Sequence, residues 1–168
     1  MKKLKFLLTT LLIGVLLFAL TACGGAEGAL SGFVAACKKG EFEKAATYVV
    51  GDFDWEDARE DNDDSIYKYI IEKTIGSFEY KVKESSMNSD ETACTMEISY
   101  SCHSSVTVWT TYGVQVALGA EQSKATVDEI LKMDKTERDM TVNLKKNDEG
   151  KWLLSLDSAA ALIASIYA

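Results

Sequence analysis

The spacing of apolar residues divides the chain after residue 28 into helical and extended segments. Apolar residues at positions i, i+3, i+4 and i+7 indicate one buried face of a helix, and residues 29–39 follow this pattern. The same spacing predicts a second helix from Phe42 to Val49 and a third from Ile66 to Ile75, which Gly76 ends. The apolar positions that define the first predicted helix are Leu30, Phe33, Val34 and Cys37.

After Gly76 the period changes from 3.6 residues to 2, which is typical of half-buried strands. The alternation predicts strands over 78–83 and 94–102, separated by a turn at 87–90, and the second strand could run on to Val106 and Val108. The period of 2 returns at Met140 and continues beyond a hairpin turn at 146–150. The predicted inward positions are Phe78, Tyr80, Val82, Cys94, Met96, Ile98, Tyr100, Cys102, Met140, Val142, Leu144, Trp152, Leu154 and Leu156.

Residues 110–135 interrupt the strands. Thr126–Glu129 fits a capping box, and the apolar residues that follow predict a short helix there. Residues 112–121 fit either another helix or the frayed end of a strand. Asp157 or Ser158 is expected to cap a last helix, whose apolar positions are Leu162, Ile163, Ile166 and Tyr167. Helices followed by antiparallel hairpins with one helical excursion predict an α+β fold, in which N-terminal helices pack on one curved antiparallel sheet.

The first residues have the pattern of an export signal. Three lysines precede an apolar run, Phe6–Leu20, which is shorter than the ~18–20 residues that a membrane-spanning helix needs. The next residues complete the sequence Leu20-Thr21-Ala22-Cys23, which resembles the bacterial lipobox. A plain secretory signal and an uncleaved anchor are the alternatives. The lipobox implies that Cys23 receives a diacylglyceryl group and holds the protein on the outer, extracytoplasmic face of the cell membrane.

This pattern predicts three segments: a signal peptide over 1–22, the lipidated cysteine with a short tether over 23–28, and a single globular domain over 29–168. Residues 1–22 carry three lysines and no acid, so the mature chain has 15 basic and 26 acidic residues and a formal charge of −11. So acidic a domain is expected to repel nucleic acid and anionic lipid head groups. The acyl chains are therefore expected to be its attachment to the membrane.

The sequence predicts no metal or cofactor site. Residues 51–64 contain eight acids, but an EF-hand loop that began at Asp52 would place Asp57 where glycine is needed and Asp63 where glutamate is needed. The stretch is therefore expected to be a solvated loop. His103 is the only histidine and cannot build a zinc site with the available cysteines. The sequence also lacks a P-loop, a dinucleotide fingerprint and a Ser-His-Asp set.

Cys37, Cys94 and Cys102 are expected to be free buried thiols. Cys94 and Cys102 lie eight residues apart on one predicted strand, so their Cα atoms are about 26 Å apart, too far for a disulfide. Whether Cys37 pairs with either of them is left open by the sequence.

The order of elements, together with the closing hairpin Asp148-Glu149-Gly150-Lys151-Trp152, resembles the nuclear transport factor two-like (cystatin-like) superfamily. The likeness extends over residues 29–157 and is closest to lipoproteins of Gram-positive bacteria in which a lipobox precedes such a domain. The excursion at 110–135 and the helical tail depart from a compact example of that fold. The resemblance implies a cone-shaped domain with a pocket between the helices and the concave face of the sheet.

Two functions fit that fold. The first is a binding module for an apolar small molecule, a peptide or a protein partner, with Tyr80, Met96, Tyr100 and Trp152 lining the pocket unless they simply pack in the core. The second is a small enzyme of the isomerase or hydrolase type. Some members of the superfamily use an Asp or a His in the pocket, but His103, Glu97 and Asp157 all fall on outward positions here. The sequence therefore offers no catalytic residue and favours binding.

Overall fold

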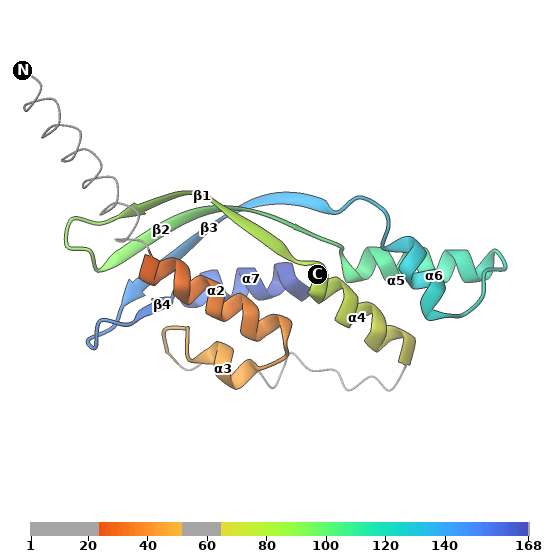
Figure 1. The fold of residues 1–168 in the computed structure, drawn as a ribbon, viewed down its shortest axis with the longest axis horizontal. Coiled ribbons are helices and arrows are strands. Elements are labelled where there is room, and N and C mark those ends of the chain that lie inside the picture. The colour runs from red at the N-terminus through yellow and green to blue at the C-terminus, as the bar shows by residue number, and fades with distance from the viewer. Residues whose placement is uncertain (1–23, 52–64, 168) are drawn as a thin grey trace, which may run out of the picture.

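The structure is a computed structural model that describes residues 24–51 and 65–167. Within this part of the chain, helices pack on a four-stranded antiparallel sheet of order β1-β2-β3-β4, which confirms the predicted α+β class. The sheet curves over α2 and α7, and α5 and α6 lie beyond its far end (Figure 1). In chain order the elements are α2 (Gly24–Lys38), α3 (Phe42–Ala46), α4 (Ser65–Ser77), β1 (Glu79–Met87), β2 (Ala93–Cys102), α5 (Ser105–Ala117), α6 (Lys124–Ile130), β3 (Thr136–Lys146), β4 (Trp152–Leu154) and α7 (Leu156–Tyr167).

The alternation along β2 sets which residues of the sheet face the helices. The predicted inward residues of β2 are all buried, whereas Glu97 between them is exposed. On β1 a bulge at Lys83 shifts the register, so that Val82 pairs with Ile98 while Glu84 pairs with Glu97. The extra residue leaves Lys83 and Glu84 both exposed and returns Ser85 and Met87 to the inner face.

The main core lies between the concave face of the sheet and helices α2 and α7. Leu30 and Phe33 of α2 and Leu162 of α7 are fully buried there, against Met96 and Ile98 of β2. A second, smaller core joins α4 to the excursion formed by α5 and α6. It consists of Ile70, Val108, Tyr112, Val127 and Ile130.

The prediction that residues 24–28 form a short tether is wrong, because these residues are the first turns of α2, which begins at Gly24. Ala26 is completely buried, so the chain joins the core immediately. A side chain at Gly25 would place its Cβ 2.8 Å from Cδ1 of Trp152. Gly25 therefore permits close packing of α2 against β4 and does not act as a flexible link.

Two other predictions at the ends of elements are also corrected, and one that was left open is decided. Val106 and Val108 belong to α5, because the side chain of Ser104 accepts a hydrogen bond from the backbone N–H of Thr107 and starts a helix directly after β2. Residues 112–117 continue that helix, which decides for the helical alternative over this part of 112–121. Ser123 caps α6, three residues before the expected cap at Thr126.

The chain around β4 also differs from its prediction. Ser155 caps α7 in place of Asp157 or Ser158, because its hydroxyl accepts from the N–H of Ser158 at 3.3 Å. Leu156 is therefore a helical, half-exposed residue. The second helix ends at Ala46, and Val49 forms a parallel bridge with Leu154 instead.

None of the helices in the described part of the chain is both long and apolar enough to cross a membrane. The acidic stretch expected to be a solvated loop, 51–64, lies outside the described residues except for its first residue, and the predicted signal peptide with Cys23 also lies outside them.

Candidate functional site

The residues predicted to line an apolar pocket are mostly part of the main core. Met96 is fully buried, Trp152 and Tyr100 are 7% exposed, and Tyr80 is half-buried. Phe78 stacks on Tyr100 with ring centroids 5.4 Å apart. Around Met96 and Trp152 the space between the helices and the sheet is therefore filled by packed side chains. These two residues belong to the main core and do not line an open pocket.

A polar pocket lies farther along the same concave face. It has a volume of about 50 Å³ and is lined by Tyr100, Cys102, Ser104, Thr136, Arg138 and Ser165. The sheet register explains four of these residues: Tyr100 pairs with Arg138 and Cys102 with Thr136, so all four share the inner face. Ser165 comes from the end of α7. A single buried water needs only ~10–15 Å³, so the pocket can hold more than one water.

Two other hollows on the described part of the chain are more open to solvent. One of about 280 Å³ lies on the outer face of β1 and β2, and another of about 390 Å³ lies at the connection of α2 and α3. Neither lies between the helices and the concave face. The polar pocket is therefore the candidate site.

Hydrogen bonds fix the walls of the pocket. The hydroxyl of Ser165 donates to the hydroxyl of Tyr100 at 3.1 Å, and the thiol of Cys102 donates to the carbonyl of Ser165 at 3.5 Å. The end of α7 is also held by Ser105, whose hydroxyl donates to the carbonyl of Tyr167 at 3.2 Å. The Tyr167 hydroxyl in turn donates to the Cys37 carbonyl on α2 at 3.1 Å. The last turn of α7 is thus held against both the sheet and α2.

Arg138 gives the pocket its charge. It is exposed, and its guanidinium makes no ion pair and no hydrogen bond with any residue in the described ranges 24–51 and 65–167. The neighbouring Lys135 differs, because its ammonium lies 3.1 Å from a carboxylate oxygen of Glu79. Both cations act on the Cys102 thiol, but burial dominates and raises its pKa. The thiol in the pocket is therefore protonated at neutral pH and is a poor nucleophile.

The predicted free thiols are placed in the core. Cys37, Cys94 and Cys102 are all buried and unbridged. Burial raises the pKa of Cys37 to about 12. The uninterrupted strand β2 separates Cys94 from Cys102, as the sequence predicted.

This burial leads to a prediction for thiol chemistry. In a Cys23→Ser variant of the full chain, Ellman's reagent at pH 8 should find three thiols after denaturation, whereas the native protein should react many times more slowly. The reason is that reaction needs the exposed thiolate, which burial suppresses. Rapid reaction of even one thiol in the native protein would contradict the buried placement, and a count below three in denaturant would reveal a bridge.

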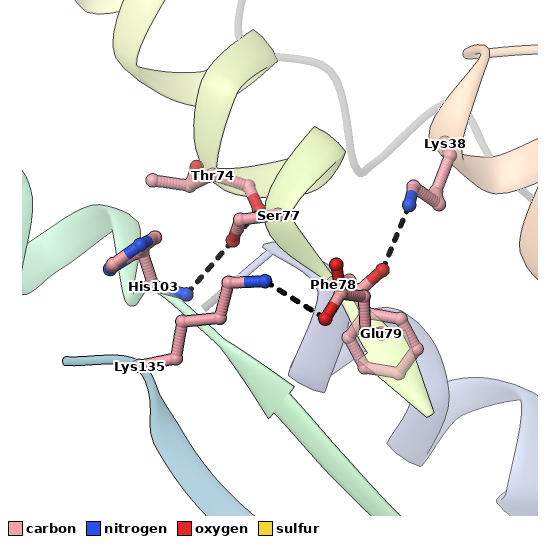
Figure 2. A network of polar contacts seen from close by, with 7 residues as sticks. All are labelled: Lys38, Thr74, Ser77, Phe78, Glu79, His103 and Lys135. Carbon is pink, nitrogen blue, oxygen red and sulfur yellow. Dashed lines mark hydrogen bonds and ion pairs between the residues drawn. The ribbon is translucent and has the colours of Figure 1, made fainter. Parts of the chain in front are cut away.

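His103 belongs to a structural junction outside the pocket (Figure 2). Its backbone N–H donates to the hydroxyl of Ser77 at 2.9 Å, and that hydroxyl donates to the carbonyl of Thr74 at 2.6 Å. Lys38 donates to the carbonyl of Phe78 at 2.8 Å in the same region. Burial, aided by Lys135, lowers the pKa of the His103 imidazole, so the ring is neutral at pH 7. The contacts connect α2, α4 and the end of β2.

The carboxylates considered for catalysis lie on exposed positions, at Glu97 and Asp157. Within the described ranges, no group of three or more His, Cys, Asp or Glu residues could hold a metal ion. The lining of the polar pocket thus contains hydroxyls, one thiol and one guanidinium. It contains none of the carboxylates considered for catalysis.

Sequence reasoning missed the polar lining. The predicted inward set on β3 began at Met140, although the period of 2 extended backwards reaches Arg138 and Thr136. That extension was the available signal for Arg138. Ser165 had no such signal, because its position depends on how α7 docks.

Comparisons with known proteins add little to this picture. No family model matches the chain, and no curated protein matches it. A solved structure that resembles it is that of a putative polyketide cyclase from Xanthomonas campestris pv. campestris, with 10% sequence identity and a TM-score of 0.33. The likeness covers 86% of this chain and 98% of the other. At this TM-score it carries no argument about the site.

Proposed function

We propose that this protein is a binding module, anchored through a diacylglyceryl group on Cys23 to the outer face of the cell membrane. The concave-face pocket receives a small molecule or one end of a peptide. The observation that carries the proposal is the pocket itself, whose hydroxyls and guanidinium converge from β2, β3 and α7. The lipobox pattern at Leu20–Cys23 supports the location.

The chemistry of the lining supports binding. The pocket offers hydrogen-bond donors and a positive charge, which are groups that orient a ligand. Its thiol is held protonated by burial, and no carboxylate or imidazole lines it. No observation in the described residues favours the isomerase or hydrolase alternative.

The binding role can be tested by NMR on the full chain purified in detergent. A mixture of small neutral, cationic and anionic compounds should contain at least one that shifts the backbone amide signals of Tyr100, Cys102 and Ser165 in a saturable way. A Ser165→Trp variant, which fills the pocket, should lose those shifts, whereas Ser89→Trp on the exposed hairpin should keep them. If no compound causes shifts at these residues, the binding role is wrong.

Anchoring gives a separate prediction. In the native host, Cys23→Ser should move the protein from the membrane fraction into the soluble fraction, or leave the precursor uncleaved, because the thiol is the acceptor of the lipid. Fractionation followed by intact-mass measurement checks this. Cys37→Ser is the matched control and should leave the protein in the membrane fraction at its mature mass. A Cys23→Ser protein of mature mass that still sediments with membranes would refute lipid anchoring.

A further inference from the structure

The pocket contains a positive charge that no residue in the described part of the chain neutralises. The ion pairs found there join Lys44 to Glu41, Lys83 to Asp139, Lys132 to Glu129 and Lys135 to Glu79. Arg138 is in none of them. Acids outnumber basic residues in this chain by 26 to 18, so a guanidinium left without a carboxylate is not explained by a shortage of acids.

The rest of the lining would add to the attraction of an anion. No carboxylate lines the pocket, and four of its six residues carry hydroxyl groups. The Ser165 hydroxyl has one hydrogen, which it can donate to the Tyr100 hydroxyl at 3.1 Å or to the Ala161 carbonyl at 2.9 Å. In either case the hydrogen of the Tyr100 hydroxyl can turn to a ligand, because no carbonyl or carboxylate among the described residues accepts it. Ser104 is the N-cap of α5, so the positive end of that helix dipole lies beside the pocket.

From this arrangement we propose that the pocket binds the carboxylate group of a small organic acid or of a peptide C-terminus. Arg138 is the charge partner, and the hydroxyl of Tyr100 is the neighbouring donor. The inference rests on the proposed binding function and names its ligand class. A guanidinium can donate two parallel hydrogen bonds to the two oxygens of a carboxylate. The volume of about 50 Å³ suits a group of three heavy atoms.

The shape of the pocket decides where the remainder of the ligand goes. Arg138 and Thr136 are both exposed, so the pocket opens at this side and the rest of the molecule extends into solvent. A carboxylate carries one negative charge, which one guanidinium balances. A phosphate monoester carries about 1.5–2 negative charges at pH 7 and is a poorer match for a single arginine. The exposure of Arg138 weakens the pair through solvent screening, so a simple carboxylate should bind in the millimolar range.

Acetate is a direct probe, and acetamide is its uncharged analogue of nearly the same shape. NMR titrations of the full chain at pH 7 and constant ionic strength, with sodium chloride as the balancing salt, should give saturable shifts at Tyr100, Cys102 and Ser165 with acetate. Acetamide should bind at least tenfold more weakly. Arg138→Gln should weaken acetate binding at least tenfold. Lys145→Gln makes the same change of charge on the outer face of the same strand and should leave binding unchanged.

Several outcomes would overturn the carboxylate assignment. Unchanged acetate binding in Arg138→Gln would show that the guanidinium is not the partner. Acetamide binding as tightly as acetate would show that the pocket is occupied without recognition of charge. Inorganic phosphate binding more tightly than acetate at these residues would replace carboxylate by another class of anion. In these three cases the pocket still binds a ligand, whereas a chain that responds to no compound refutes the binding function as well.

Discussion

Leu162→Ala is expected to lower the free energy of unfolding by about 3–5 kcal/mol, the range found when a fully buried leucine is truncated in a packed core. Leu162 has no exposed surface and lies in α7, which covers the concave face of the sheet. The loss has two parts: the free energy of burying the methyl groups that are removed, and the cost of the cavity that the rigid neighbours do not fill. Because domains are stable by only about 5–15 kcal/mol, this one change removes a large share of the total.

Urea unfolding of the full chain, followed by circular dichroism, measures this loss. Leu118→Ala is the matched control, because Leu118 follows α5 and is 83% exposed. The same change there should alter stability by no more than about 0.5 kcal/mol. Equal effects at the two positions would mean that α7 does not pack as described. A loss below about 1.5 kcal/mol for Leu162→Ala would lead to the same conclusion.

Ile98→Asp is expected to abolish the cooperative native fold at pH 7. Ile98 is fully buried in the middle of β2, paired with Val82 on one side and Met140 on the other. Losing the apolar side chain costs about 2–5 kcal/mol, and burying a carboxyl group without a partner adds at least ~1–3 kcal/mol. The sum is comparable with the whole stability of a domain.

Thr95→Asp places the same carboxyl on the half-buried outer face of the same strand, where it also removes the hydrogen bond from the Thr95 hydroxyl to the Asn143 side chain. The change should cost only about 1–2 kcal/mol, because water still reaches the new carboxylate. The dispersion of amide proton signals in NMR spectra distinguishes a folded chain from an unfolded one. Ile98→Asp giving a native spectrum, or Thr95→Asp giving an unfolded one, would show that the faces of β2 are assigned the wrong way round. A shift of one residue exchanges the two faces of a strand, so this pair of variants tests the register directly.

Periodicity predicted the interior of the long elements well. The inward residues of β2 and the buried residues of α2 follow from the sequence, because a residue's face is fixed by its position in a regular helix or strand. An apolar face can then be predicted to be buried even when the element that covers it is unknown. The same reasoning correctly predicted that Cys94 and Cys102 form no disulfide with each other.

The ends of elements were predicted less well, because a cap depends on one local hydrogen bond. At the start of α7 the sequence pattern favoured Asp157 or Ser158, but Ser155 is the cap, because its hydroxyl accepts from the N–H of Ser158. The hydroxyl of Ser158 is used elsewhere, since it accepts from the backbone N–H of Asn143 on β3 at 2.9 Å. The choice between the two serines was therefore made by the docking of α7 on β3.

By itself the sequence determined the α+β class, the inner face of the sheet, and the excess of acidic residues. These properties depend on local periodicity and composition. The tertiary structure alone decided that α2 starts at Gly24, that Met96 and Trp152 are packed core, and that a polar pocket remains beside Arg138. The physical reason is that a pocket is the space that remains between elements distant in sequence where their side chains do not fill the gap. The last turn of α7 meets β2 and β3 at Ser165, and no pattern within any one of these segments encodes where that meeting leaves room.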